Sequence, residues 1–233
     1  VLLTAVALET LTLSAVAIVM HDTMRPQDRK ALIGQEFVAM VKTLLTPPAR
    51  LRHFYIAITF DAIAYGAGYA LLYGLLSRTF GFTHFQLGLM ASVSSLTWAA
   101  TQLSFGKMVD RHGTVPFMLF SEMLAVMIMV AWLFVHTFPS FLALHALWGI
   151  NLAAWMPSFL AWMTNSFSDA ERAQEMGRIA AFRGLIAFPA PYLGGVLYDW
   201  FGFRGPILFN IVMALVVIVL FWKWVREPEV PVA

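Results

Sequence analysis

Polar residues recur at every fourth position of one apolar stretch of this 233-residue chain. Asp61, Tyr65, Tyr69 and Tyr73 stand in "FYIAITFDAIAYGAGYALLYGLL". On one helix this spacing sets a carboxyl and three phenols in a row of roughly 18 Å on a single face, at about 1.5 Å per residue. Such groups can hold a polar solute, and a carboxyl inside a membrane can carry a proton. We therefore predict that this row faces a solute path and that Asp61 couples transport to protons. A permanent ion pair between Asp61 and a basic group is the alternative.

Another charged side chain within an apolar stretch is Arg183. It is a candidate for binding an anionic solute group or for pairing with a carboxylate. Because it lies near one end of its stretch, it could instead extend its guanidinium to the lipid headgroups.

The composition of the chain indicates which type of secondary structure positions these residues. The chain is 60% hydrophobic and 12% charged, against about 25% charged residues in soluble domains, and its mean hydropathy is +0.75. Apolar runs that reach the roughly 20 residues of a bilayer-crossing helix, without strict alternation, predict an all-α integral membrane protein. The seven predicted spans cover 1–20, 53–77, 84–106, 115–137, 140–164, 176–200 and 204–225.

The basic residues orient these spans, since Lys and Arg favour the cytoplasmic side. If the polar loop 21–52 is cytoplasmic, the loops near 107–113 and 165–178 and the C-terminal tail 227–233 share that side. That side then carries Arg25, Arg29, Lys30, Lys42, Arg50, Arg52, Lys107, Arg111, Arg172, Arg178, Lys223 and Arg226. The opposite side carries Arg78 and Arg204. The bias predicts a multi-pass protein of the cell membrane with a cytoplasmic C-terminus.

One charged loop carries a family resemblance. "GKMVDRHG", with Gly106, Asp110, Arg111 and Gly113, resembles the G-x-x-x-D-R-x-G loop of the major facilitator superfamily. The resemblance implies twelve helices in two halves, with this loop on the cytoplasmic side between the second and third helices of each half. Here it follows the second of the last six spans, which matches in position.

A second stretch, "RGLIAFPAPYLGG", partly resembles the G-P-x-x-G-G pattern of the fifth helix of a half in many superfamily members. Its Gly184, Pro191, Gly194 and Gly195 are predicted to mediate helix packing. The resemblance thus implies a major-facilitator-type six-helix half bundle at 53–226, preceded by one transmembrane helix at 1–20 from an N-terminal half and a central loop at 21–52. The missing half, or a partner chain, is an expected partner.

The resemblance also assigns helices to a central cavity. Trp98, Gln102, Asn151 and Trp155 lie in helices that it places there, so they join the solute-path candidates. Glu122 lies in a helix that the family places at the periphery, and we expect it to make a structural pairing or a loop contact rather than to contact the solute.

The loop itself has a predicted mechanical role. Glycines 106 and 113 permit a tight turn, and Asp110 can face the positive N-terminal end of the helix near 169–178. Arg111 can pair with Glu171 or Glu175. We predict a clasp that holds one conformation and breaks in another; an ordinary solvated loop is the alternative.

Motifs for other functions are missing from the sequence. There is no Walker loop, G-x-S-x-G, H-E-x-x-H or dinucleotide fingerprint, no cysteine, and no His pair at metal-ligand spacing. We predict no enzyme activity, no cofactor or metal, and no nucleic-acid binding. The predicted function is secondary transport of a small solute by alternating access, with proton-coupled export as the favoured form. The alternatives are a non-transporting membrane interaction protein and one half of a split transporter.

Overall fold

The computed structural model describes residues 47–228. The predicted span 1–20 and residues 21–46 of the predicted central loop lie outside the described residues. The described part is all-helical, and no strand occurs between residues 47 and 228. This confirms the predicted fold class.

Six helical spans follow the short turn η2 (Ala49–Leu51). The first consists of α3 (Arg52–Ala67), the 3-10 turn η3 (Tyr69–Leu71) and α4 (Leu72–Phe80). Next come α5 (His84–His112), α6 (Val115–Trp132) and α7 (Phe138–Asn165). The fifth consists of α8 (Asp169–Ala187) and α9 (Ala190–Phe201), and the last is α10 (Arg204–Trp224). The starts of the spans match the predicted ones to within a few residues, except that the fifth starts earlier. α5 ends later than predicted, at His112 instead of residue 106, and α6 ends earlier, at Trp132 instead of residue 137.

Four described segments are both long and apolar enough to cross a membrane: Ala49–Phe80, Val115–Trp132, Glu171–Phe201 and Arg204–Trp224. α5 and α7 have 29 and 28 residues, which is also sufficient length. Their mean hydropathy is lower because α5 carries many Ser and Thr residues and α7 carries His, Asn and several Trp residues.

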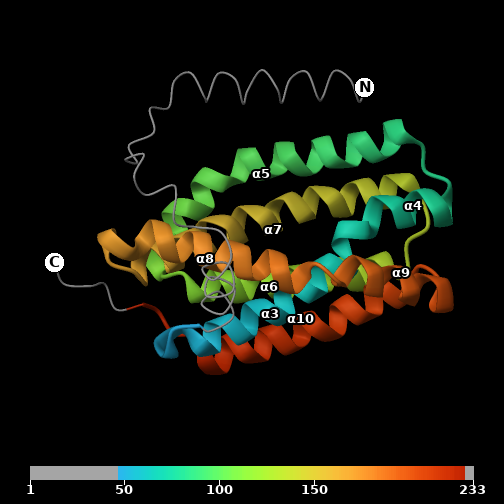
Figure 1. Cartoon of the computed structure of the whole chain (residues 1–233). Coiled ribbons are helices and arrows are strands. Elements are labelled where there is room, and N and C mark those ends of the chain that lie inside the picture. The colour runs from blue at the N-terminus through green and yellow to red at the C-terminus, as the bar shows by residue number, and fades with distance from the viewer. Residues whose placement is uncertain (1–46, 229–233) are drawn as a thin grey trace, which may run out of the picture. The chain divides into compact units, whose positions relative to one another are not determined.

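The helices pack around α3, α6, α7 and α10 (Figure 1). α3 lies against α10, α8 and α9, α6 bridges α7 and α10, and α5 packs along α7. Aromatic side chains fill the two ends of the bundle. At one end Phe54 stacks on Trp162, with ring centroids 3.8 Å apart, and at the other Phe80 meets Phe203 at 5.1 Å.

The first span is broken at Gly68, which has φ −110° and ψ −76°. Asn210 of α10 lies against this glycine, and a Cβ there would come within 2.7 Å of the Asn210 Cβ. The predicted row of four residues on one straight helix is therefore wrong at its end. Tyr73 lies beyond the break and stacks on His145, with centroids 5.7 Å apart.

Three prolines inside the predicted spans have different effects. Pro189 separates α8 from α9, and Pro191 occupies the first turn of α9, where a missing N–H costs little. Pro157 interrupts nothing, because α7 remains helical through it.

The end of the bundle that carries the N-terminus of α3 is held together by polar contacts. Arg50 pairs with Glu171 across 3.6 Å. The indole Nε1 of Trp162 donates to the carbonyl of Arg226 at 2.8 Å. The carboxylate of Glu227 accepts hydrogen bonds from the Val115 N–H at 2.7 Å and the Thr114 hydroxyl at 2.8 Å. Chain segments far apart in sequence thus meet at this one end.

Ser168 and Glu171, at the start of α8, have the spacing of a capping box. α8 does begin at Asp169, but the Ser168 hydroxyl donates to the Glu171 carboxylate at 3.0 Å and caps no backbone N–H. A complete capping box instead starts α5, where Thr83 and Gln86 exchange hydrogen bonds.

Candidate functional site

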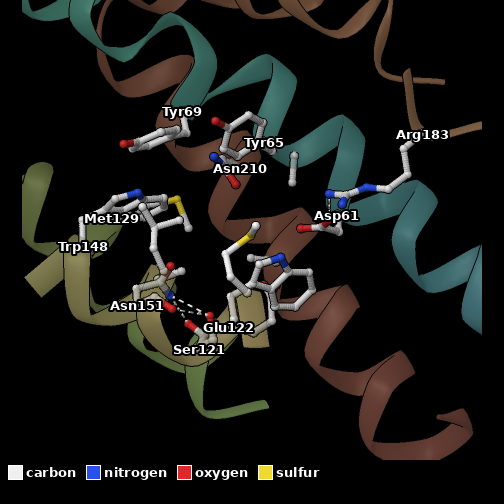
Figure 2. Close-up of a pocket in the computed structure, with 16 residues that line it drawn as sticks. Asp61, Tyr65, Tyr69, Ser121, Glu122, Met129, Trp148, Asn151, Arg183 and Asn210 are labelled. Carbon is white, nitrogen blue, oxygen red and sulfur yellow. Dashed lines mark hydrogen bonds and ion pairs between the residues drawn. The ribbon is translucent and has the colours of Figure 1, made fainter. Parts of the chain in front are cut away.

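A cavity of about 230 Å³ lies among the helices, partway along the bundle (Figure 2). It brings together side chains from α3, η3, α6, α7, α8 and α10. The residues that line it are Asp61, Ala64, Tyr65, Tyr69, Ser121, Glu122, Ala125, Met129, Trp148, Asn151, Leu152, Trp155, Met156, Arg183, Asn210 and Ala214.

An ion pair stands at one side of the cavity. The guanidinium of Arg183 on α8 donates to the Asp61 carboxylate on α3 at 2.6 Å. The Asp61 and Arg183 side chains are 14% and 28% exposed, so the pair is largely withdrawn from solvent. Arg183 also lies over the Phe159 ring, 5.2 Å from its centroid. The Arg183 guanidinium therefore points toward the Asp61 carboxylate and not toward the lipid headgroups. In this conformation Asp61 forms an ion pair with a basic group, as in the alternative to proton coupling.

Aromatic rings form the opposite wall. Tyr65 lies 5.2 Å from Tyr69, and Tyr69 stacks on Trp148 at 4.2 Å with an interplanar angle of 11°. Figure 2 shows Tyr65 and Tyr69 above the cavity, with Trp148 beside them. Two of the three predicted phenols thus reach the cavity that Asp61 also lines.

Asn151 on α7 is fixed by α6. Its side-chain amide donates to the backbone carbonyl of Ser121 at 2.5 Å and to the Ser121 hydroxyl at 3.0 Å. The Ser121 hydroxyl in turn donates to the Asn151 carbonyl at 3.3 Å. The predicted candidate Asn151 therefore lines the cavity in a rigid orientation, as does Ser121, which sequence reasoning missed.

Glu122 on α6 is the second carboxyl of the cavity, with 8% of its surface exposed. Within residues 47–228 it forms no ion pair and no hydrogen bond through its side chain, although it interacts electrostatically with Asp61 and Arg183. The expectation of a structural pairing is wrong, because the helix that carries Glu122 faces inward at this position. Its charge inside an apolar span was the signal that could have identified it.

The model of the Major Facilitator Superfamily matches residues 54–233 of this chain. The chain belongs to the major facilitator superfamily. It is a multi-pass integral membrane protein of the transporter type, and the predicted family is confirmed. Among curated proteins, no sequence matches it.

Two predicted lining residues of this superfamily member do not reach the cavity. Trp98 and Gln102 lie on α5, which packs on α7 and stands one helix away from it. The approach is close at Gly149, where a Cβ would overlap Thr97. Gln102 is exposed, and the indole N–H of Trp98 is buried without a hydrogen-bond acceptor among the described residues. Trp155, the remaining candidate, does line the cavity.

The superfamily loop is built differently from our expectation. α5 runs straight through Gly106, so the turn depends on Gly113 alone, whose φ of +92° favours glycine. Asp110 and Arg111 are exposed and form no ion pair with any residue from 47 to 228.

The predicted partners of the loop are occupied elsewhere. Glu171 pairs with Arg50, and Glu175 pairs with Arg178 at 3.2 Å. The predicted clasp to the start of α8 is therefore not formed in this conformation, and its formation in another stays a prediction. The loop is instead held by Glu227, whose carboxylate lies within 2.9 Å of where a Cβ on Gly113 would stand.

The second superfamily stretch contains one packing glycine. A Cβ on Gly194 would overlap the carbonyl oxygen of Ala67 on α3, so only glycine allows this approach. Gly184 and Gly195 have no atom within 4 Å of an added Cβ among the described residues, and Pro191 starts α9. Gly184 and Gly195 therefore approach no helix among the described residues, and their packing role stays a prediction.

Within residues 47–228, no cluster of His, Asp and Glu side chains could hold a metal ion. Among the described residues, the site combines one ion pair, one unpaired carboxyl, an oriented amide and an aromatic wall.

Proposed function

We propose that this superfamily member moves a small solute across the membrane by alternating access, with the cavity at Asp61, Glu122 and Asn151 as its binding site. The observation that carries this proposal is the convergence of polar side chains from several spans on one cavity. Polar groups inside a membrane are costly and mark solute or ion pathways. Binding sites of secondary transporters lie partway through the bilayer.

The Asp61–Arg183 ion pair gives the site a means of responding to solute. It joins α3 to α8, and it borders the cavity, so a bound polar group competes for its hydrogen bonds. Pro189 separates α8 from α9, which lets the two parts of this span respond separately. A solute that favours one arrangement of α3 and α8 shifts the balance between two conformations.

The charge distribution supports a cytoplasmic location for the end that holds Glu227. Among the described residues outside the cavity, that end carries Arg50, Arg52, Lys107, Arg111, Arg172, Arg178, Lys223 and Arg226. The opposite end carries Arg78 and Arg204. We therefore place the C-terminus in the cytoplasm. Coupling to protons and the direction of export belong to this proposal, as does a second six-helix half that completes the pathway.

A flux experiment tests the proposal. The 233-residue chain is reconstituted into liposomes, alone and together with the second six-helix half, and charge movement and solute uptake are measured under pH and solute gradients, with a panel of cationic, neutral and anionic solutes. We expect saturable flux that Asp61→Asn reduces and that Gly195→Ala, next to open space, leaves unchanged. Absence of flux for every solute and gradient contradicts the proposal; solute binding without flux then favours a non-transporting protein or a half that requires its partner.

A further inference from the structure

We propose that the cavity binds a small organic cation, with Glu122 as its counter-charge, and that a proton competes for the same carboxyl. This deepens the proposed function by naming the class of solute, and it rests on that function only for the movement of the cation, not for its binding.

The charges that line the cavity do not balance. Asp61 and Arg183 neutralise each other across 2.6 Å. Among the described lining residues, Glu122 is the remaining charged one, so these residues together carry one net negative charge when ionised. An anionic solute would meet Glu122 without a free cation to receive it, because Arg183 already donates to Asp61.

The environment of Glu122 requires a positive partner. The titratable or charged groups that face it are Asp61 and Tyr65 of α3, Tyr69 of η3 and Arg183 of α8. The lining residues of α7 and α10 contribute only apolar, indole and amide side chains. A lone carboxylate inside a membrane is costly, and either a bound proton or a bound cation removes that cost. Both occupy the same oxygens, so they exclude each other.

The aromatic wall identifies an organic rather than a metallic cation. Rings of Tyr and Trp attract ammonium groups when these lie within about 6 Å of the ring centroid. Tyr69 and Trp148, stacked at 4.2 Å, and Tyr65 and Trp155 line the space that Glu122 also faces. A hard metal ion such as Ca²⁺ requires about six to eight oxygen ligands, and the cavity offers one unpaired carboxyl.

The size of the cavity limits the ligand. Its volume of about 230 Å³ is below the roughly 300–1,000 Å³ of sites for drug-sized molecules. An ammonium with short alkyl substituents fits this space and matches both the charge and the apolar rings.

Direct binding tests the proposal. The full chain in lipid nanodiscs is titrated with choline and with its uncharged isostere 3,3-dimethylbutanol, and tryptophan fluorescence reports occupancy of the wall that contains Trp148 and Trp155. We expect choline to bind at least tenfold more tightly than the isostere at pH 8. We also expect its affinity to fall at least tenfold at pH 5. A choline affinity independent of pH overturns the competition, and equal binding of the isostere overturns the role of charge.

Variants assign the effect to Glu122. Glu122→Gln should lose at least tenfold in choline affinity together with the pH dependence, and Glu122→Asp should retain the pH dependence at lower affinity. Glu227→Gln, at the end of the bundle, is the matched acidic control and should bind choline as the unmodified chain does. Circular dichroism checks that each variant is folded. Equal choline binding by Glu122→Gln and the unmodified chain, or no choline binding by a folded chain, overturns the proposal.

The flux and binding experiments can fail independently. Choline binding at Glu122 without any flux supports this inference and contradicts transport. Flux of an uncharged or anionic solute that Glu122→Gln leaves unchanged supports transport and contradicts this inference.

Discussion

Asp61→Asn removes the only ion-pair partner that residues 47–228 give to Arg183. Breaking one side of a buried pair costs about 3–5 kcal/mol. We expect the lower end, about 3 kcal/mol, because Arg183 keeps 28% of its side-chain surface exposed and retains the Phe159 ring at 5.2 Å. At about 1.4 kcal/mol per factor of ten, this is a change of roughly 100-fold in the unfolding equilibrium.

The double variant separates the ion pair from other effects. Arg183→Met leaves the more deeply buried Asp61 carboxylate unpaired, so its cost should be at least as large. Asp61→Asn with Arg183→Met removes both charges, and the free energy of unfolding should return to within about 1 kcal/mol of the unmodified chain. The resulting coupling energy should exceed about 2 kcal/mol, well above the additivity error of distant sites.

The measurement is reversible unfolding of the purified chain in mixed micelles, followed by helical circular dichroism as the fraction of denaturing detergent rises. A cycle on Arg78 and Asp199 is the matched control, since that pair spans 3.7 Å with side chains 69% and 66% exposed. Its coupling should stay below about 1 kcal/mol. A double variant of Asp61 and Arg183 that costs as much as the two single variants together refutes the reasoning.

Three further predictions concern helix contacts, each measured by the same unfolding titration. Gly194→Ala should destabilise the chain by about 1–3 kcal/mol because the added Cβ overlaps the Ala67 carbonyl. Gly195→Ala, where an added Cβ meets no described atom, should change the free energy of unfolding by less than about 0.5 kcal/mol. Equal effects of the two variants contradict the assignment of Gly194 as the packing glycine. Glu227→Ala should cost about 1 kcal/mol, because the first N–H of α6 loses its acceptor, and an unchanged midpoint contradicts this. Asn151→Leu should cost about 1–3 kcal/mol by removing the two hydrogen bonds that the Asn151 amide donates to Ser121, and a neutral result contradicts the proposed orientation.

The sequence predicts the helices well because each helix needs an apolar run long enough to cross the membrane, and the length of such a run can be read from the sequence. The turns that join the runs contain charged residues or glycine, so the helix ends fall close to the predicted residues. The break at Gly68 was not predictable in this way. It depends on the side chain of Asn210, which approaches from a helix about 140 residues later in the sequence.

The candidate site was predicted in part. Asp61 and Tyr65 share a cavity because four-residue spacing places them on one face of α3. Tyr69 joins them from η3, beyond the break at Gly68. Glu122 was misassigned because its helix was placed by family position, whereas the direction of a side chain depends on the rotation of the helix. The prediction that Gln102 lines the cavity was wrong for the same reason. The local sequence does not show which side of α5 packs against α7.

The fifth span contacts α3 at two points of different chemistry. Arg183 on α8 forms an ion pair with Asp61. Gly194 on α9 packs closely against the backbone of Ala67 because glycine has no side chain. The break at Pro189 lies between these contacts. The charged contact responds to bound ions and to ligands, whereas the glycine contact responds only to side-chain volume. Chemical cross-links placed separately across each contact can therefore restrain one part of this span while the other stays free to move.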